Sequence, residues 1–300
     1  SENIIRWLSI TAFMVFAMAV IGAITRLTES GLSMVEWRPF IGALHPMNEV
    51  EWQRVFDLYK KIPEYTEQNS WMQLSDFKQI LFLEWFHRLW WRLIGLVYVL
   101  PMICFCVKGM IPDGYKGRFL LLLALGGSQG VMGWIMVQSG LSELTSVSHY
   151  RLAVHLILAV IVFACLVWTI LDLKGHKVKW SWDNLCLKRH GIIALGFLYT
   201  TIIWGAFVAG LDGGMIYNTW PMMGDGFIPD EAAIAGAFHD NPAGAQFFHR
   251  WIAVASAFVI LTYAIRVKSK VLGHVVLLQV LLGVATLLSQ VTIPLAAMHQ

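Results

Sequence analysis

Seven long apolar stretches divide the chain, and no other feature restricts its fold as strongly. A helix that crosses a bilayer needs about 20 mostly apolar residues, and lipid offers the backbone no hydrogen-bond partner, so each stretch predicts a membrane helix. The composition agrees, because 57% of the residues are apolar and only 14% are charged, against about 25% charged in soluble domains. The predicted spans are residues 5–25, 86–107, 118–138, 151–172, 191–210, 248–266 and 271–292.

An eighth span is expected to begin at Pro294, because proline suits the first turn of a helix. We therefore predict an all-α integral membrane protein with eight helices in the natural protein, of which this sequence only begins the eighth. The first span lacks the basic start and the small-residue cleavage site of a signal peptide. It is therefore predicted to be a membrane helix.

The loops between these spans differ in charge. Segments 108–118, 172–190 and 266–270 are rich in lysine and arginine, whereas segment 211–247 contains five acidic residues and neither Lys nor Arg. Lysine and arginine accumulate in the cytoplasmic loops of membrane proteins. The N-terminus is therefore predicted to lie in the cytoplasm or an organelle matrix, with segment 211–247 and the long loop 27–83 outside.

The first outer loop is too long to lack structure of its own. Asn48 and Glu51 have the spacing of a capping box, and apolar residues follow at helical intervals at Trp52, Val55, Phe56 and Tyr59. This pattern predicts an amphipathic helix that lies at the membrane interface. Ser75 or Asp76 is expected to cap a helix that continues directly into the second span.

Four histidines share a position near the outer ends of the even-numbered spans: His87, His155, His249 and His299. Neutral imidazole is the commonest metal ligand, and a polar ring in or near lipid is costly unless it is coordinated or hydrogen-bonded. Their wide separation is unlike the short spacing of a structural zinc site. It suits two helices that face each other across a flat macrocycle, one axial imidazole from each. His149 is a spare candidate, and a snorkelling or hydrogen-bonded side chain is the alternative.

The chain also contains an internal duplication. Phe86-His87-Arg88 recurs as Phe248-His249-Arg250, and the flanking features also match: Trp37-Arg38-Pro39 with Trp220-Pro221, Gln129 and Gly133 with Gln279 and Gly283, and Leu152–His155 with Ala296–His299. Four helices separate the copies, so both halves insert in the same sense. We predict two pseudo-symmetric four-helix bundles, residues 1–175 and 176–300, related by an axis along the membrane normal.

The two predicted pockets differ at one position. Glu84 precedes His87 by three residues and therefore lies on the same helix face, whereas Gln246 holds the equivalent position before His249. This asymmetry predicts that one pocket does chemistry while the other carries electrons. The alternative is that Glu84 is a solvated acid on the outer face or an ion-pair partner of Arg88.

Two arginines directly follow their histidines. Arg88 and Arg250 are candidates to pair with haem propionates at the outer surface, and Arg26 and Arg151 are weaker candidates for the same role. Snorkelling of a long cationic side chain to the membrane interface explains the same positions equally well. The sequence leaves both interpretations open.

Several motifs together resemble the haem A synthase family in its alphaproteobacterial and mitochondrial form: Arg26-Leu27-Thr28-Glu29-Ser30-Gly31-Leu32-Ser33-Met34-Val35-Glu36-Trp37-Arg38-Pro39, Glu84-Trp85-Phe86-His87-Arg88, Phe248-His249-Arg250 and Pro294-Leu295-Ala296-Ala297-Met298-His299-Gln300. The resemblance covers essentially the whole chain. It implies an eight-helix enzyme that oxidises the C8 methyl of haem O to the formyl group of haem A, for assembly of cytochrome c oxidase.

The resemblance also implies roles for individual residues. His87 and His155 would flank the substrate haem, His249 and His299 would bind a haem b cofactor, and Glu84 matches the essential glutamate of the family. Some bacterial members carry a cysteine pair in the first outer loop, and residues 27–83 contain no cysteine. We therefore do not expect the thiol-linked behaviour of those members in this chain.

Two other functions are compatible with a duplicated membrane bundle. A non-catalytic dihaem b-type cytochrome in quinol electron transfer would need no difference between Glu84 and Gln246, and a duplicated-bundle transporter would place polar residues near the bilayer midplane.

The expected partners are membrane lipid, haem O synthase, an electron donor and a second copy of the chain, with no nucleic acid. The expected location is a bacterial plasma membrane or a mitochondrial inner membrane.

Overall fold

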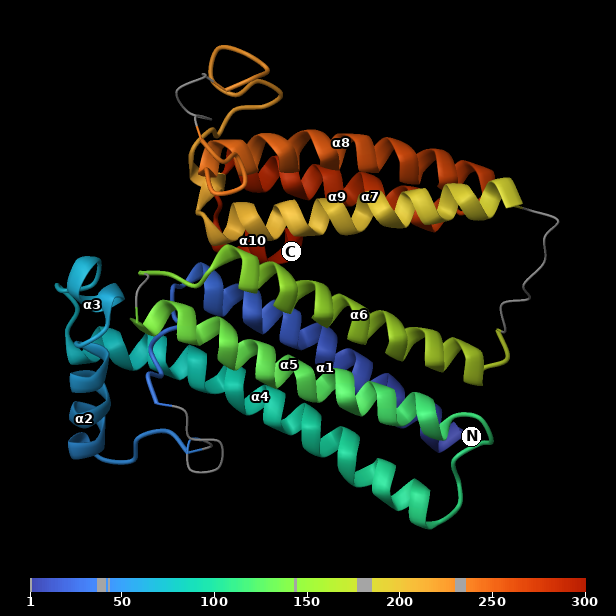
Figure 1. The fold of residues 1–300 in the computed structure, drawn as a ribbon, viewed down its shortest axis with the longest axis horizontal. Coiled ribbons are helices and arrows are strands. Elements are labelled where there is room, and N and C mark those ends of the chain that lie inside the picture. The colour runs from blue at the N-terminus through green and yellow to red at the C-terminus, as the bar shows by residue number, and fades with distance from the viewer. Residues whose placement is uncertain (1, 37–41, 43, 143–144, 177–184, 230–235) are drawn as a thin grey trace. The chain divides into compact units, whose positions relative to one another are not determined.

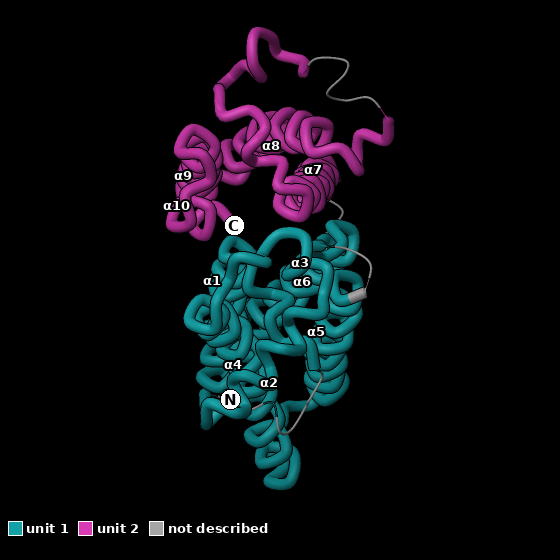
Figure 2. The backbone as a smooth tube through the Cα atoms, turned by 90° about the vertical axis from the view of Figure 1, so that its left-hand side faces the viewer, with its two compact units in different colours: residues 1–178 teal, residues 179–300 magenta. Residues whose placement is uncertain are grey.

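The computed structural model describes residues 2–36, 42, 44–142, 145–176, 185–229 and 236–300. Across those residues the chain is helical, and the only β-type pairing is an isolated bridge between Met223 and Gly226. The chain divides into two units, Ser1–Val178 and Lys179–Gln300 (Figure 2). The predicted class, an all-α integral membrane protein, is confirmed.

Seven of the described helices are long and apolar enough to cross a membrane. They are α1 (Glu2–Leu27), α4 (Leu74–Val107), α5 (Lys116–Ser142), α6 (His149–Leu173), α7 (Leu185–Gly210), α8 (Pro242–Arg266) and α9 (Lys270–Leu288). Each of the seven predicted spans corresponds to one of these helices.

The last predicted span is wrong at its end. The helix α9 stops at Leu288 rather than at residue 292, because Gln290 and Val291 have φ values of 55° and 59° in the left-handed region, which a right-handed helix cannot include. A further helix, α10 (Ile293–His299), follows with Pro294 in its first turn, as the sequence predicted.

The N-terminal unit is built on a four-helix bundle. Helix α1 packs against α4 and α6, and α5 packs against the same two helices (Figure 1). Trp7 lies at the centre of the core near the N-terminus, with its ring 4.9 Å from that of Tyr98 and 5.5 Å from that of Phe119. Its indole nitrogen donates to the carbonyl of Val97 at 2.8 Å. This satisfies the one polar atom of a large buried ring.

The first outer loop forms two short helices, α2 (Glu49–Tyr59) and α3 (Pro63–Glu67), at the end of the bundle opposite the N-terminus (Figure 1). Asn48 caps α2 by accepting from the backbone of Glu51 at 2.9 Å, as its sequence pattern predicted. Helix α4 begins earlier than the apolar span, where Gln73 and Asp76 form the capping box. The predicted continuation into the second span is confirmed, but Gln73 is the N-cap, rather than Ser75 or Asp76.

The apolar face of α2 is covered by protein. The expectation that this face enters the membrane interface is therefore wrong. Phe56 and Tyr59 are buried, and their rings lie 5.0 and 5.1 Å from that of Phe77 at the start of α4. Leu32 and Leu81 complete the same core. The outer loop is therefore a packed subdomain that rests on α4.

The C-terminal unit follows a similar order. Helix α7 packs against α8, α8 against α9, and α9 against α10, with the short 3₁₀ turn η2 (Gly213–Met215) against α7 and α8. Asn241 caps α8, since its side chain accepts from the backbone of Ala243 at 2.9 Å and of Gly244 at 3.2 Å. The loop between α7 and α8 lies at the same end of its unit as α10 (Figure 1).

Candidate functional site

In the N-terminal unit, each of the two singled-out histidines lies against a glycine on a neighbouring helix. A Cβ atom built on Gly22 of α1 would lie 3.5 Å from Nε2 of His87 on α4, and one on Gly133 of α5 would lie 3.5 Å from Cε1 of His155 on α6. These distances are ordinary van der Waals contacts. Each imidazole therefore approaches a stretch of bare helix backbone.

The C-terminal unit repeats this arrangement at shorter range. A Cβ on Gly205 of α7 would lie 3.0 Å from Cε1 of His249 on α8, and one on Gly283 of α9 would lie 2.8 Å from Cε1 of His299 on α10. Any larger residue at Gly283 would require the ring or its helix to shift, because atoms packed so closely repel each other. Glycine at these positions lets the imidazoles lie directly on the adjacent helix.

Hydrogen bonds hold the two rings of the C-terminal unit. Nδ1 of His249 lies 3.1 Å from the carbonyl oxygen of Thr201, which can only accept, so Nδ1 carries the proton and Nε2 keeps its lone pair. The amide nitrogen of Gln279 lies 3.2 Å from Nδ1 of His299 and donates to its carbonyl at 2.6 Å. The two ring centroids are 6.4 Å apart, with 70° between the planes.

The histidines of the N-terminal unit have fewer such contacts. Gln129 donates to the backbone carbonyl of His155 at 3.3 Å, which is the counterpart of the bond from Gln279. Nδ1 of His155 is buried and has no hydrogen-bond partner. A buried ring nitrogen without a partner costs free energy and marks a site that a ligand would complete.

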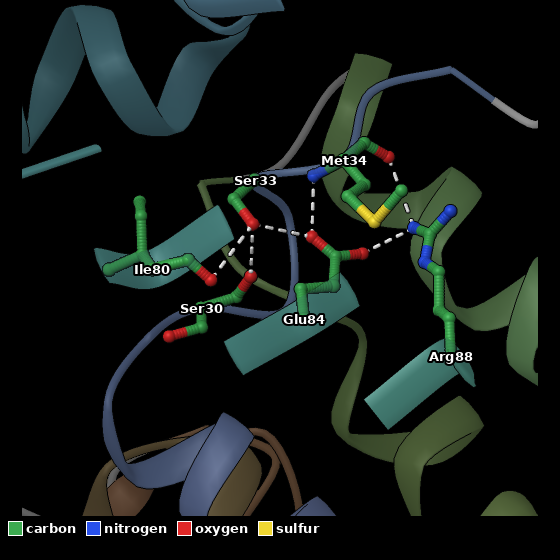
Figure 3. Close-up of polar contacts among 6 residues, drawn as sticks. All are labelled: Ser30, Ser33, Met34, Ile80, Glu84 and Arg88. Carbon is green, nitrogen blue, oxygen red and sulfur yellow. Dashed lines mark hydrogen bonds and ion pairs between the residues drawn. The ribbon is translucent and has the colours of Figure 1, made fainter. Parts of the chain in front are cut away.

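Glu84 is buried in a set of polar contacts at the start of α4 (Figure 3). Its Oε2 lies 2.7 Å from the hydroxyl of Ser33 and 2.5 Å from the backbone nitrogen of Met34. Its Oε1 accepts from Arg88, which follows one turn later on the same helix. The interpretation of Glu84 as a solvated acid is wrong, because its exposed fraction is 2%. Its pairing with Arg88 is confirmed.

The equivalent residues of the C-terminal unit also bind an outer loop. Gln246 donates to the carbonyl of Tyr217 at 3.0 Å, and Arg250 donates to the same oxygen at 3.3 Å. Arg250 donates further to three loop carbonyls, at 2.9 to 3.2 Å: Thr219, Pro221 and Met222. Its exposed fraction is 5%, so the snorkelling interpretation is wrong for Arg250.

The weaker candidates lie near the same ends of the helices. Arg151 donates to the carbonyl of Ile135 on α5 at 2.6 Å. Arg26 stands in the last turn of α1. His149 is the first residue of α6, and its ring centroid lies 4.0 Å from that of Tyr150. The predicted repeat at Trp37-Arg38-Pro39 lies outside the described residues.

The sequence interpretation missed the glycines that face the histidines. The duplication pairs Gly133 with Gly283 without showing that either faces a histidine, and Gly22 and Gly205 stand outside the matched motifs. A signal was present, because Gly22 precedes Trp37 by the same interval as Gly205 precedes Trp220. Ser33 and Met34 were missed as partners of Glu84, and nothing in their spacing from it identifies them.

These features define the class of protein. Apolar helices carry four partly buried histidines, of which His249 and His299 lie side by side, and among the described residues no group of three or more His, Cys, Asp and Glu side chains is placed to hold a metal ion. Paired imidazoles without further protein ligands suit a metal whose other positions are filled by a macrocycle. The chain is thus an integral membrane protein with a pair of neighbouring histidines in its C-terminal unit.

Comparison with known proteins identifies the family. The profile of the COX15-CtaA family, described as cytochrome oxidase assembly protein, matches residues 5–300. The chain is 46% identical to the Heme A synthase of Rhodospirillum centenum, over 98% of this chain and 83% of that protein. It is 44% identical to that of Parvibaculum lavamentivorans, over 98% and 88%, and 40% identical to that of Maricaulis maris, over 100% and 92%. The chain belongs to the COX15-CtaA family.

Proposed function

We propose that this protein is a haem A synthase that converts the C8 methyl of haem O into the formyl group of haem A, by successive oxidations, for cytochrome c oxidase assembly. The full-length similarity to proteins named Heme A synthase supports the substrate and the product. The observation that carries the proposal in the structure is the spacing of His249 and His299, whose ring centroids are 6.4 Å apart.

This spacing fits a haem iron held between two imidazoles. A metal with about 2 Å to each ligating nitrogen separates the two ring centres by about 6 Å. The bond from His249 Nδ1 to the Thr201 carbonyl supports the fit, because it fixes the tautomer that presents Nε2 to a metal. We assign a resident haem b to this pair. A haem bound there supplies one-electron chemistry, and the protein supplies its ligands, orientation and electrostatic surroundings.

We assign the substrate haem to His87 and His155. Their looser contacts with Gly22 and Gly133, and the unpartnered Nδ1 of His155, support a site that a haem enters and leaves. Arg88 and Arg250 each directly follow a histidine that would bind a haem, so we also assign both arginines contact with the haem propionates. For Arg250 this role adds to its contacts with the loop carbonyls.

Glu84 is assigned the catalytic role at the substrate. Three donors surround its carboxylate, from Ser33, Met34 and Arg88, so it is held in one orientation before the substrate binds. A fixed carboxylate in this place can accept a proton from the reacting methyl group or stabilise positive charge that develops on the methyl carbon. Both roles require the ionised form.

Location and partners follow from the loop charges. The basic loops support a topology with the N-terminus in the cytoplasm and all four histidines near the outer face of a bacterial plasma membrane, or the equivalent topology of a mitochondrial inner membrane. Haem O synthase would supply the substrate, an electron-transfer partner would exchange electrons with the resident haem, and self-association in the lipid is expected.

Haem extraction and mass measurement test this function. Purified protein supplied with haem O should contain haem b together with haem O or haem A, whereas haem b alone would indicate the dihaem cytochrome instead. Glu84→Gln should keep the haem spectrum and lose at least about 100-fold in haem A formation. Ser33→Ala, which removes one donor and keeps the charge, should lose less. Normal haem A formation by Glu84→Gln would remove Glu84 from the mechanism.

A further inference from the structure

Helix α5 contacts His155 of α6 at two places, one helical turn apart. A Cβ on Gly133 would lie 3.5 Å from Cε1 of the imidazole, and the side-chain nitrogen of Gln129 donates to the backbone carbonyl of His155 at 3.3 Å. Residues four apart share one face of a helix, so the glycine and the glutamine form a single surface beside this histidine. Because Cε1 is bonded to Nδ1, the Nδ1 edge of the ring is turned toward α5.

Two polar atoms in this contact remain unsatisfied. Nδ1 of His155 and Oε1 of Gln129 are both buried, and neither has a hydrogen-bond partner among the residues that the structure describes. Such atoms cost free energy when they are kept from water. The two are complementary, because an amide oxygen accepts and Nδ1 of a neutral imidazole can carry a proton. The bond from Gln129 to the carbonyl is near the long end of the usual range, which leaves the amide room to turn.

The C-terminal unit shows that a glutamine in this position reaches the ring. Gln279 stands four residues before Gly283 on α9, as Gln129 stands before Gly133 on α5. Its side-chain nitrogen donates to the backbone carbonyl of His299 at 2.6 Å and lies 3.2 Å from Nδ1 of the same residue. One amide group therefore touches both the backbone and the ring of its histidine. An equivalent contact with the ring is within reach of Gln129.

We propose that Gln129 orients His155 for the substrate haem: its amide nitrogen holds the backbone carbonyl, and its amide oxygen accepts the proton of Nδ1. The inference rests on the function proposed above, which assigns a haem to His155. A proton on Nδ1 leaves the lone pair of the imidazole on Nε2, which is then the nitrogen available to iron. Gln129 acts through His155 and is therefore a positioning residue.

Two substitutions separate the bond to the ring from the bond to the backbone. Gln129→Met keeps the length of the side chain and removes both the donor and the acceptor. Gln129→Glu removes the amide donor and keeps an acceptor, which is stronger when it is charged. If Gln129 only joined α5 to α6, both variants would behave alike, because each loses the amide bond to the carbonyl.

The midpoint potential of the N-terminal haem distinguishes these roles. Redox titration of the purified protein with and without added haem O gives this midpoint by difference. An acceptor at Nδ1 makes the imidazole a more basic ligand, which favours ferric iron. Gln129→Met should therefore raise the midpoint, and Gln129→Glu should lower it. Because the expected shifts have opposite signs, each variant tests the proposal if the other does not fold.

Haem O affinity provides a second measurement. Loss of a hydrogen bond that orients a metal ligand typically costs 10- to 100-fold in affinity, so Gln129→Met should bind haem O weaker by about that factor. Gln79→Met makes the same change at an exposed position on α4 and should leave both the affinity and the midpoint unchanged.

The outcomes separate this proposal from the proposed function. A shift of the same sign in both Gln129 variants, or no shift in either, would overturn the role of Gln129. Unchanged haem O affinity in Gln129→Met would count against it as well. Absence of haem A formation by the unaltered protein would instead count against the proposed function, since the midpoint of a haem bound at His155 is measured without turnover.

Discussion

The two units present their histidines to glycines in the same way but with different closeness. In the C-terminal unit a Cβ on Gly205 or Gly283 would lie 3.0 or 2.8 Å from the facing imidazole, whereas in the N-terminal unit the corresponding distances at Gly22 and Gly133 are both 3.5 Å. Tight packing fixes a side chain, and looser packing lets it adjust. The difference is what we expect of one site that keeps its haem and another that exchanges it.

The units also differ in how they fasten their outer loops. In the N-terminal unit the carboxylate of Glu84 accepts from the backbone nitrogen of Met34, whereas in the C-terminal unit Gln246 donates to the carbonyl of Tyr217. The side chain in each case complements the polarity that the loop presents. The exchange of Glu for Gln between the halves therefore has a structural cause in addition to any catalytic one.

Loss of one of the two histidines proposed to bind haem in the C-terminal unit should have the largest effect. His249→Ala should abolish haem b binding and turnover, while haem O still binds at the N-terminal unit. The loss in haem affinity should exceed the roughly 100-fold that removal of a supporting hydrogen bond typically costs a metal site. Extraction and mass measurement of the bound haems report both sites at once.

A histidine elsewhere in this unit provides the control for that variant. His274 is exposed on α9, and His274→Ala should leave haem content unchanged. Unchanged turnover in His249→Ala would contradict the relay of electrons through the C-terminal haem. Loss of haem O binding in the same variant would contradict the independence of the two sites.

Addition of one methyl group where α9 meets His299 in the C-terminal unit should have the next largest effect. In Gly283→Ala the new Cβ would lie 2.8 Å from Cε1 of His299, so the ring must shift from the ligating position. We expect a loss of roughly 10- to 100-fold in haem b affinity and a changed midpoint potential. Gly273→Ala on the same helix meets no atom within 4 Å and should keep the haem. Equal behaviour of the two variants would show that the packing at Gly283 is not restrictive.

Exchange of the loop-binding residue should have a moderate effect on stability. Gln246→Glu would place a buried carboxylate against the carbonyl oxygen of Tyr217, where two acceptors repel and the donated hydrogen bond is lost. We expect a cost of about 1–3 kcal/mol in the free energy of unfolding, measured by chemical denaturation. Gln68→Glu, at the exposed end of α3 in the other unit, is the control. A stable Gln246→Glu variant would mean that Arg250 compensates for the new charge.

The number and order of the membrane helices could be predicted from the sequence, because lipid requires a long apolar run for every crossing. Their ends could not, since these depend on local backbone geometry. The left-handed residues Gln290 and Val291 end α9 early, and the capping box of Gln73 starts α4 well before its apolar run. The amphipathic pattern of α2 predicted a helix correctly but not that α4 would cover its apolar face.

The candidate site was predictable where the duplication repeated a side chain. The four histidines, Glu84 and the two arginines all stand in recurring motifs. The partners of Glu84 are of another kind, because Met34 contributes a backbone nitrogen, which every residue except proline offers.

The smallest effect should come from a methyl group in the looser site. In Gly133→Ala the new Cβ would meet His155 at 3.5 Å, an ordinary contact that needs no movement of the ring. Alanine also favours the helix over glycine by up to about 1 kcal/mol, so the variant should unfold at a slightly higher temperature and retain haem O binding. Gly127→Ala, with no atom within 4 Å, isolates the helix effect. If Gly133→Ala instead lost its substrate haem as severely as Gly283→Ala loses haem b, the two sites would be equally restrictive. The contrast between a resident and an exchanging haem would then need another physical basis.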